Sequence, residues 1–394
     1  MTHISAAANS ERPHVVFGVT SGASAFTLLR GQLAWFQQQG WRVTLVTAPG
    51  ELISRTVTRE GVCLHEIAMT RRISPVTDTR ALVSWVAYLL RERPQAINAS
   101  TPKAGLLGHV AGWVARVPRR VYIVRGLRVE GARGMIKAIL WLMEWLTMRL
   151  ATDVVFVSPS LAREAHRRHL IAPGKAWIIG AGSSNGVDAA AVARRCAEVD
   201  ASVLRASMHI PASAFVVGFV GRVAPDKGVE TLVQACESPA IDPRTHLLVV
   251  GNVEDESMTA ALDRLGKRGH RTGWTDDAWG YLPAMDVLCL PTRREGFPNV
   301  VLESAAAGIP AIVTNATGAI DSVIDGETGF VISVGDDKAL VERLNELASA
   351  PDRAHELGKA AKARVERDFV PERIWQGVLS ITEGRGATAD VRRV

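Results

Sequence analysis

Short apolar runs alternate along this chain with longer segments in which apolar residues recur every three or four positions. The short runs are rich in Val, Ile and Leu and end at Gly, Pro or Asn. Such runs are typical of strands buried on both faces, as in parallel sheets covered by helices. The expected strands begin at His14, Arg42, Cys63, Ala96, Arg120, Asp153 and Ala176, and then at Phe215, His246, His270, Asp286, Ala311 and Gly329.

These strands are too many for one sheet, and a polar helical stretch from Ala189 separates the two sets without a strand pattern. The repeated strand-then-helix order predicts an α/β protein with two tandem Rossmann-like domains. We place the boundary between residues 189 and 190. Ligands are then expected in a cleft that the two domains face, at the carboxyl ends of the strands. The polar ends of the chain, residues 1–12 and 385–394, are expected to be disordered.

The composition is that of an ordinary globular protein, with 394 residues, 47% hydrophobic and 22% charged. This excludes collagen-like, coiled-coil and intrinsically disordered classes. The four cysteines are too far apart for a zinc cluster, so we expect buried free thiols in a reducing compartment. The first residues lack the apolar core of a signal peptide, and no run of 18 apolar residues predicts a transmembrane helix.

Charge is distributed unevenly. Residues 1–190 hold 23 Lys and Arg against 11 Asp and Glu, a net charge of +12, and the remainder holds 23 against 29, a net charge of −6. Seven of the ten tryptophans also lie in the first half. A basic half rich in Trp favours an anionic partner, which could be a membrane surface, a phosphorylated ligand or nucleic acid. Nucleic acid is disfavoured because no helix-turn-helix, zinc-finger or RNA-binding aromatic signature is present.

The segment 131–151 predicts a long amphipathic helix with Arg and Lys among its apolar residues. It could face the core. It could also lie in a membrane interface, with Trp141 and Trp145 at the level of the lipid headgroups.

The strongest candidate site is the run PTRREGFPNVVLESAAAG, residues 291–308. It starts where an expected strand ends and continues as a helix, with Pro298 near the first helical position and Gly308 at the end. The free N–H groups near Asn299 and Val300 make the helix start a candidate anion site. Glu295 and Glu303 are spaced to hold hydroxyl groups on either side of that anion.

A second candidate lies after the strand from Phe215. That strand ends at Gly221 and is followed by Arg222, a turn through Pro225, and then Lys227. Two cations brought together by a tight turn predict a clamp for a diphosphate.

The sequence E-G-F-P-N-x-x-L-E resembles the motif of the retaining glycosyltransferases of family 4, which have the GT-B fold, and G-R-x-x-x-x-K-G resembles their diphosphate clamp. The resemblance covers residues 14–384. It implies a nucleotide-sugar donor, typically a UDP-sugar. The implied donor-binding residues are Gly221, Arg222, Lys227, Gly251, Trp274, Glu295, Gly296, Phe297, Pro298, Asn299, Val300 and Glu303. Trp274 could equally be a packing residue.

The runs from Ser100, Ile123 and Gly180 look like one branch of this family. Its members extend undecaprenyl-diphosphate-linked saccharides in capsule, O-antigen or exopolysaccharide synthesis. The implied acceptor-binding residues are Ser21, Gly22, Lys103, Arg125, Arg128, Glu130, Ser184 and Asn185. Many family members have a histidine where this chain has Arg125. Because arginine cannot act as a base at neutral pH, we expect Arg125 to bind phosphate.

The family's last helix crosses back onto the first domain. The resemblance therefore implies an N-terminal acceptor-binding domain of residues 1–189 plus 374–394 and a C-terminal donor-binding domain of residues 190–373. No D-x-D motif occurs, so we expect a metal-independent enzyme without a cofactor. Arg222, Lys227 and the helix start would stabilise the leaving diphosphate. Glu295 is the one strong candidate for a nucleophile, but the family reacts on one face of the sugar, and Glu295 is then expected to orient the sugar.

These expectations combine into a hexosyltransferase-type, retaining glycosyltransferase. It would move one sugar to a lipid-diphosphate-linked saccharide on the cytoplasmic face of the membrane, as a peripheral protein on an anionic surface. Two alternatives stay open, a transferase with a small soluble acceptor and a catalytically silent, membrane-bound scaffold of a polysaccharide assembly complex. Sugar-nucleotide epimerases of this fold are disfavoured because they lack the motif around Glu295.

Overall fold

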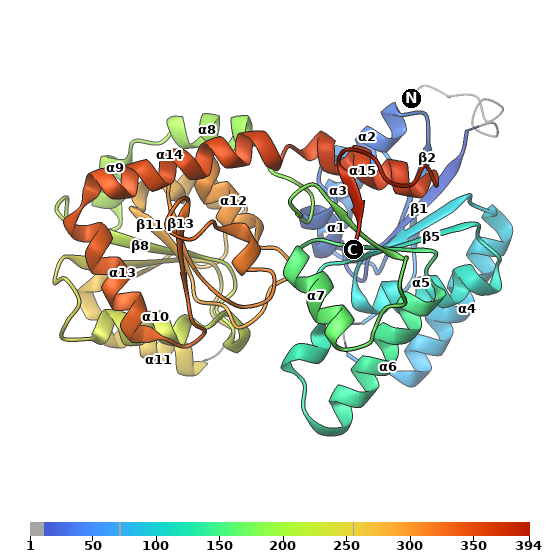
Figure 1. The fold of residues 1–394 in the computed structure, drawn as a ribbon, viewed down its shortest axis with the longest axis horizontal. Helices are drawn as coiled ribbons and strands as arrows, with labels where there is room; N and C mark the ends of the chain where they lie inside the picture. The colour runs from blue at the N-terminus through green and yellow to red at the C-terminus, as the bar shows by residue number, and fades with distance from the viewer. Residues whose placement is uncertain (1–11, 71, 255) are drawn as a thin grey trace. The chain divides into compact units, whose positions relative to one another are not determined.

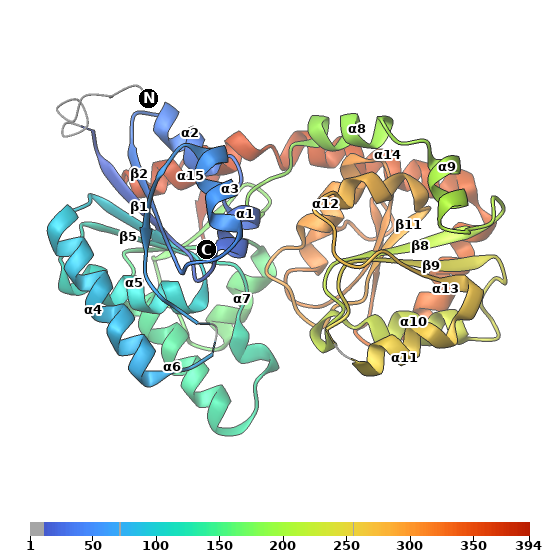
Figure 2. The ribbon, with the colours of Figure 1, turned by 180° about the vertical axis from the view of Figure 1, so that it is seen from behind.

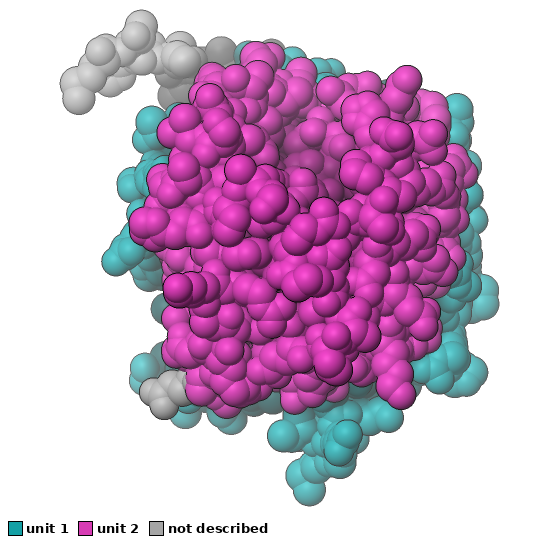
Figure 3. Space-filling view, turned by 90° about the vertical axis from the view of Figure 1, so that its left-hand side faces the viewer, with its two compact units in different colours: residues 1–185, 371–394 teal, residues 186–370 magenta. Residues whose placement is uncertain are grey.

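The computed structural model describes residues 12–70, 72–254 and 256–394 (Figures 1 and 2). Its contacts divide the chain into two compact units, residues 1–185 with 371–394 and residues 186–370 (Figure 3). Both divisions fall a few residues before the expected boundaries at 189 and 373. The first eleven residues, which we expected to be disordered, lie outside the described part of the chain.

The first unit contains an eight-stranded sheet in the order β14-β7-β6-β5-β4-β1-β2-β3. Seven of its strands are parallel, and all seven were expected from the apolar runs. The strands are β1 (His14–Gly18), β2 (Arg42–Thr47), β3 (Cys63–Glu66), β4 (Ala96–Ala99), β5 (Arg119–Val124), β6 (Asp153–Phe156), β7 (Ala176–Ile179) and β14 (Val391–Arg393). Four of them, β1, β4, β6 and β7, are buried along their whole length, which explains the absence of a polar alternation there.

The expectation of disorder at residues 385–394 was wrong. Strand β14 pairs antiparallel with β7, with Val391 opposite Ile179 and Arg393 opposite Trp177. Val391 is buried, and the guanidinium of Arg393 lies 4.6 Å from the centre of the Trp177 ring. The neighbouring strand therefore orders a segment whose own pattern is too short and too basic to predict a strand.

Helices cover both faces of this sheet. They are α1 (Gly22–Leu28), α2 (Gln32–Gln38), α3 (Leu52–Glu60), α4 (Pro75–Glu92), α5 (Pro102–Val114), α6 (Gly134–Leu150), α7 (Pro159–Arg167) and α15 (Pro371–Thr382). On one face, α5 packs between α4 and α6 and against the sheet (Figures 1 and 2). A Cβ atom on Gly105 would lie 2.7 Å from the Tyr122 ring, so this glycine lets α5 approach β5 closely. Helix α15 packs on α2, which joins the end of the chain to the first unit.

The second unit contains a six-stranded parallel sheet in the order β10-β9-β8-β11-β12-β13, and its strands also match the expected ones. They are β8 (Phe215–Val220), β9 (Thr245–Val250), β10 (Gly269–Arg271), β11 (Val287–Leu290), β12 (Ala311–Thr314) and β13 (Gly329–Ile332). The helices are α8 (Ala189–Ala197), α9 (Ala201–Ser207), α10 (Val229–Glu237), α11 (Glu256–Arg264), α12 (Asn299–Ala306), α13 (Asp337–Ser349) and α14 (Pro351–Asp368). Both units are thus the Rossmann-like α/β domains that the sequence predicts.

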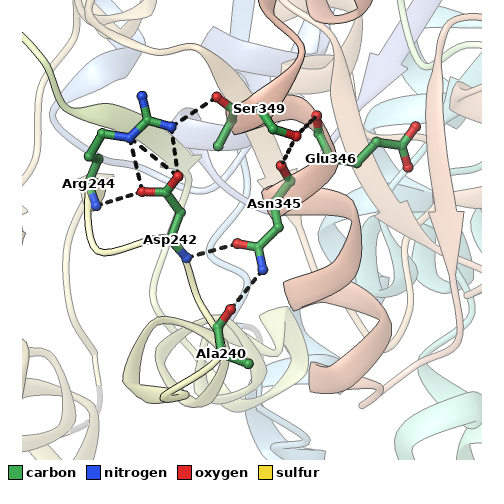
Figure 4. Close-up of polar contacts among 7 residues, drawn as sticks. Ala240, Asp242, Arg244, Asn345, Glu346 and Ser349 are labelled. Carbon is green, nitrogen blue, oxygen red and sulfur yellow. Dashed lines mark hydrogen bonds and ion pairs between the residues drawn. The ribbon is translucent and has the colours of Figure 1, made fainter.

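A polar cluster fixes α13 to the loop before β9 (Figure 4). The side chain of Asn345 accepts a hydrogen bond from the backbone N–H of Asp242 and donates one to the carbonyl of Ala240, both at 2.8 Å. Arg244 pairs with the Asp242 carboxylate at 2.7 Å. The polar side chains of Asp242, Arg244 and Asn345 are thus engaged with one another and with the nearby backbone, so the cluster is structural.

The cysteines are unpaired, but not all are buried as expected. Cys236 and Cys289 are buried, whereas Cys63 is exposed. Cys63 begins β3, which forms the edge of the first sheet, so its side chain is not covered by a further strand.

Candidate functional site

The loops that follow β8 and β11 are joined in the second unit. After β8, a single 3₁₀ turn (η3, Pro225–Lys227) carries Lys227 and ends at Gly228. Gly228 has a φ of 66°, and a Cβ atom there would lie 1.9 Å from the carbonyl oxygen of Pro291. Only glycine permits this approach. The carbonyl of Asp226 also accepts hydrogen bonds from the Arg293 N–H at 2.9 Å and the Thr292 hydroxyl at 3.0 Å.

This junction brings together two residues that the sequence singled out independently. The Lys227 Nζ atom lies 2.5 Å from Glu295 Oε1, and the two side chains are 20% and 15% exposed. One was predicted to bind phosphate and the other to hold sugar hydroxyls. Their contact places a cation and a carboxylate together at the carboxyl ends of β8 and β11. In a sugar phosphate, the cation would bind the phosphate and the carboxylate would bind the sugar hydroxyls.

Arg222 lies beside this pair in sequence but has a different partner. It follows β8 and Gly221, its side chain is 51% exposed, and it pairs with Glu254 at 2.5 Å. Glu254 comes four residues after β9. Strand ends β8 and β9 touch there, since a Cβ atom on Gly251 would lie 2.1 Å from the Gly221 carbonyl. Sequence reasoning missed Glu254, although an acid just past a neighbouring parallel strand indicates a counter-ion for Arg222.

The helix start after β11 differs from the expectation in one detail. Helix α12 begins at Asn299, and Pro298 occupies the N-cap position before it, so Pro298 is not the first helical residue. Proline has no side-chain oxygen to accept the N–H groups of the first turn, so Pro298 leaves them uncapped. The buried Oδ1 atom of Asn299 has no hydrogen-bond partner among the described residues. Polar groups left in this way are costly unless a ligand or water satisfies them.

The remaining motif residues form the wall of this helix start. Gly296, Phe297 and Pro298 are buried, and the Phe297 ring packs 5.5 Å from that of Phe369. The N–H of Glu295 donates to the Thr317 carbonyl at 2.8 Å, which fixes the loop. Val300 and Glu303 lie half-buried on α12.

Trp274, after β10, is 62% exposed, so it does not pack in the core of the second unit. An exposed indole is available to a ligand, as stacking on a nucleotide base would require.

In the first unit, Arg125 has the geometry of an anion-binding residue. It follows β5, and its Nη1 atom donates to the Ser184 carbonyl at 2.5 Å and to the Ser184 hydroxyl. The Nε and Nη2 atoms are buried and have no partner among the described residues. Burial lowers the pKa of Arg125 to about 10, which leaves the side chain cationic at neutral pH. A buried guanidinium with two unpaired nitrogens favours an anionic ligand.

Lys103 and Asn185, two further expected acceptor residues, are engaged in packing. The Lys103 ammonium bonds the two Asp78 carboxylate oxygens at 2.6 and 2.8 Å and also the Arg72 carbonyl, which uses all three of its hydrogens. Asn185 donates to the Arg30 carbonyl at 2.8 Å and accepts from the indole N–H of Trp375 at 2.7 Å. Lys103 therefore joins α5 to α4, and Asn185 fixes α15.

The other expected acceptor residues divide between packing and exposure. The Ser21 hydroxyl accepts from the Ser24 N–H and caps α1, and Gly22 is a close-packing position, since its Cβ atom would lie 2.7 Å from Ile53. Arg128 is exposed and Glu130 half-buried on the 3₁₀ turn η2 (Arg128–Gly131).

Glu144 was missed in the sequence. It is 4% exposed on the inner face of α6, lines a cavity with Lys103 and Arg128, and accepts a hydrogen bond from the Tyr122 hydroxyl at 2.9 Å. Burial raises the pKa of Glu144 to about 7. Its sequence signal is weak, since Glu144 stands out only as the one acid in a helix whose other charged residues, Lys137 and Arg149, are basic.

Because the folded pKa of Glu144 lies above its unfolded value, its contribution to stability is present at low pH and lost as pH rises through 7. Glu144→Gln keeps an acceptor for Tyr122 and removes the titration. We expect the difference in unfolding free energy between pH 5 and pH 8 to shrink by up to ~3 kcal/mol. Calorimetry at both pH values checks this, with the exposed Glu342→Gln as control. An unchanged pH dependence in Glu144→Gln would contradict it.

Within the described ranges, no three His, Cys, Asp or Glu side chains are placed to hold a metal ion. The helices seen there are also too short or too polar to cross a bilayer.

Known proteins resemble the chain over nearly its whole length. The family described as glycosyl transferase 4-like domain matches residues 21–182, and glycosyl transferases group 1 matches residues 201–364. The capsular polysaccharide biosynthesis glycosyltransferase CapM of Staphylococcus aureus is 32% identical over 372 residues, which cover 93% of this chain and 96% of CapM. The UDP-Gal:alpha-D-GlcNAc-diphosphoundecaprenol alpha-1,3-galactosyltransferase of Escherichia coli is 27% identical over 284 residues, which cover 70% and 72% of the two chains.

Among solved structures, Anabaena Alr3699/HepE in complex with UDP superposes with a TM-score of 0.77 at 19% identity. The superposition covers 94% of this chain and 100% of that one. At 19% identity this likeness shows a shared fold and nothing more specific.

Proposed function

The chain belongs to the group 1 and 4-like glycosyltransferases of GT-B fold, and from that premise we propose that it is a retaining enzyme of bacterial envelope polysaccharide synthesis. It would transfer one sugar from a UDP-sugar to a lipid-diphosphate-linked saccharide. The observation that carries the proposal is the contact of Lys227 with Glu295 at the carboxyl edge of the second sheet. The Staphylococcus relative acts in capsule synthesis, and the Escherichia relative acts on a diphosphoundecaprenol-linked sugar.

The proposed chemistry needs the donor's leaving diphosphate to be stabilised. Lys227 and Arg222 supply cations, and the first turn of α12 supplies backbone N–H groups that its N-cap side chain leaves uncapped. Binding of the diphosphate exchanges each cation's carboxylate partner for a phosphate oxygen. Glu295, released from Lys227, is then free to accept hydrogen bonds from sugar hydroxyls. UDP as the nucleotide is supported by the shared fold of HepE, which binds UDP and UDP-glucose.

Retention follows in this proposal from reaction on one face of the sugar. The bond between the anomeric carbon and the phosphate oxygen breaks as the acceptor hydroxyl oxygen bonds to the same carbon. The acceptor's proton moves to the leaving phosphate, so no protein base is consumed. Arg125, cationic and unpaired on two nitrogens, is proposed to bind the acceptor's phosphate.

The surface of the first unit supports the membrane as a partner. Every exposed charged residue between 72 and 150 is a cation, namely Arg72, Arg80, Arg91, Arg93, Arg116, Arg128, Arg133, Lys137 and Arg149. These residues lie on or next to the layer of helices formed by α4, α5 and α6. Apolar side chains are also exposed on this layer, with Met135 at 80% and Leu142 at 54% on α6. Cations around exposed apolar groups match an anionic lipid surface. These features support the proposal that the protein acts as a peripheral protein on the inner face of the cytoplasmic membrane.

The two tryptophans of α6 differ in their fit to this surface. Trp145 is 36% exposed and can reach headgroups. The indole N–H of Trp141 donates to the Arg168 carbonyl at 2.9 Å, so this side chain is held against the protein and stacks on Trp145.

The function is tested by transfer assays in EDTA with UDP-glucose, UDP-galactose and their N-acetylated forms. The acceptor is a lipid-diphosphate-linked saccharide in anionic vesicles, in neutral vesicles or in detergent. We expect one sugar to be transferred, with its anomeric configuration retained by NMR, and faster in anionic vesicles than in neutral ones. Inversion, or a strict metal requirement, contradicts the mechanism. Equal turnover of a small soluble acceptor contradicts the lipid-linked one, and nucleotide binding without any transfer favours the scaffold.

A further inference from the structure

A groove lies where α4 and α5 end, next to the residues that lead into β4 and β5. Its volume is about 410 Å³, and it is lined by Leu90, Arg93, Pro94, Gln95, Ala115, Arg116, Val117 and Pro118. The expected acceptor residues follow the other ends of these strands. We propose that this groove binds the headgroup phosphate of an anionic phospholipid, between Arg93 and Arg116. The inference rests on the membrane association proposed above and adds a defined lipid site to it.

The two arginines are held toward the groove by an unusual backbone. Arg93 is the C-cap of α4 with a φ of 45°, and Arg116, just after α5, has a φ of 55°. Glycine or asparagine normally occupies such left-handed positions, because other residues pay a steric cost there. Of five non-glycine residues with positive φ in the described ranges, two line this one groove. Arginine at both positions indicates that its side chain serves a purpose there.

Neither guanidinium has a counter-ion among the described residues. Within the part of the chain that the structure describes, the side chains of Arg93 and Arg116 make no hydrogen bond or ion pair, and no acidic residue lines the groove. Glu92, next to Arg93 in sequence, is paired with Arg42 and Arg91 instead. Two exposed arginines across a groove without an acid are complementary to one phosphate, which guanidinium groups bind in bidentate fashion.

Apolar surface at the groove favours a lipid over a free phosphate. Apart from the two arginines and Gln95, the lining residues are leucine, proline, alanine and valine. Leu90, which lines the groove, is 52% exposed, and Trp113 and Val114, which directly precede its lining residue Ala115 in sequence, are 58% and 47% exposed. Leu90 also ends a row of exposed residues on α4, with Val76 and Val83, at seven-residue spacing on one side of the helix. The groove therefore continues the exposed apolar surface of this layer.

The test compares two double variants that lose the same charge from the same layer. Arg93→Asn with Arg116→Asn changes the groove, and asparagine tolerates the left-handed backbone. Arg80→Gln with Arg149→Gln removes two exposed cations outside it. Binding is measured to vesicles of three parts phosphatidylcholine to one part phosphatidylglycerol, to short-chain phosphatidylglycerol below its micelle concentration, and to inorganic phosphate. UDP affinity and the thermal midpoint are measured alongside.

Loss of any two surface cations is expected to weaken vesicle binding about 30-fold. The groove variant is expected to lose at least another tenfold, and to lose binding of the short-chain lipid, which the control variant keeps. UDP affinity should be equal in both. Equal loss in the two variants, or phosphate binding as tight as lipid binding, overturns the lipid site while leaving membrane association intact. A wild-type protein that binds no vesicles overturns both, and transfer in detergent then shows whether the glycosyltransferase proposal stands.

Discussion

Replacement of Glu295 by glutamine is expected to lower the transfer rate about 100-fold or more while UDP binding stays equal or becomes tighter. The carboxylate is the group proposed to orient the donor sugar, and an amide cannot accept hydrogen bonds on both of its terminal atoms. Because Glu295 also neutralises Lys227 at 2.5 Å, its loss leaves that cation available to phosphate. Rate and affinity therefore move in different directions, which a merely misfolded variant would not show.

The measurements are initial rates with a UDP-sugar, calorimetric titration with UDP, and intact-protein mass spectrometry during turnover of the wild type. No sugar adduct is expected on the protein. An adduct mapped to Glu295 would establish double displacement and overturn the single-face mechanism. The exposed Glu342→Gln, on α13 in the same unit, is the control and should leave rate and affinity unchanged.

Lys227→Ala is expected to weaken UDP binding about 100- to 1000-fold, and Arg222→Ala about tenfold. Removal of Lys227 deletes a phosphate partner and also leaves the 15% exposed Glu295 carboxylate unpaired beside the phosphates, where it repels them. Arg222 and its partner Glu254 are each about half exposed, so solvent screens the loss of that arginine. We therefore expect Lys227 to contribute more to UDP affinity than Arg222, because the Lys227 pair is more buried.

Calorimetric titration in EDTA measures both affinities. The double variant Lys227→Ala with Glu295→Gln should recover part of the lost affinity, because the repelling charge is gone. Arg353→Ala removes another exposed arginine of the same unit and should change nothing. Wild-type affinity in both clamp variants would place the nucleotide elsewhere. An equal loss of UDP affinity in Arg353→Ala would show that the effect comes from the change in net charge and not from a specific site.

The fold was predictable because its strands are buried on both faces, and such strands have nearly continuous apolar sequences. Strand β14 was not predicted, because two of its three residues are arginines and it is ordered by pairing with β7. The pairing of Lys227 with Glu295 could be anticipated as two motifs at one sheet edge. The close approach that makes it possible, glycine against the Pro291 carbonyl, depends on tertiary contacts.

The acceptor side was harder to predict, because a sequence shows cations without their counter-ions. Lys103 was expected to bind the acceptor because its segment resembles one branch of the family, but Asp78, 25 residues earlier, already pairs with its ammonium group. Arg125 was expected on the same ground, and its guanidinium has two nitrogens without a partner among the described residues. Only the folded contacts separate these two cases. Glu144 was overlooked because an acid in an apolar helix looks like a solvent-facing residue until its burial is known.

The division of the chain also bears on how it is made. Residues 186–370 form one continuous unit, whereas the other unit needs its last 24 residues, 371–394, to place α15 on α2 and β14 on β7. Domains usually complete in the order of their synthesis, the N-terminal one first. Here we expect the reverse order. Residues 186–370 can fold as soon as they have left the ribosome. The other unit cannot be completed until residues 371–394 are made. Until then β7 is an unpaired edge strand, and the Asn185 side chain lacks its Trp375 partner. A ribosome stalled before residue 371 would therefore leave a finished donor-side unit attached to an unfinished, aggregation-prone partner.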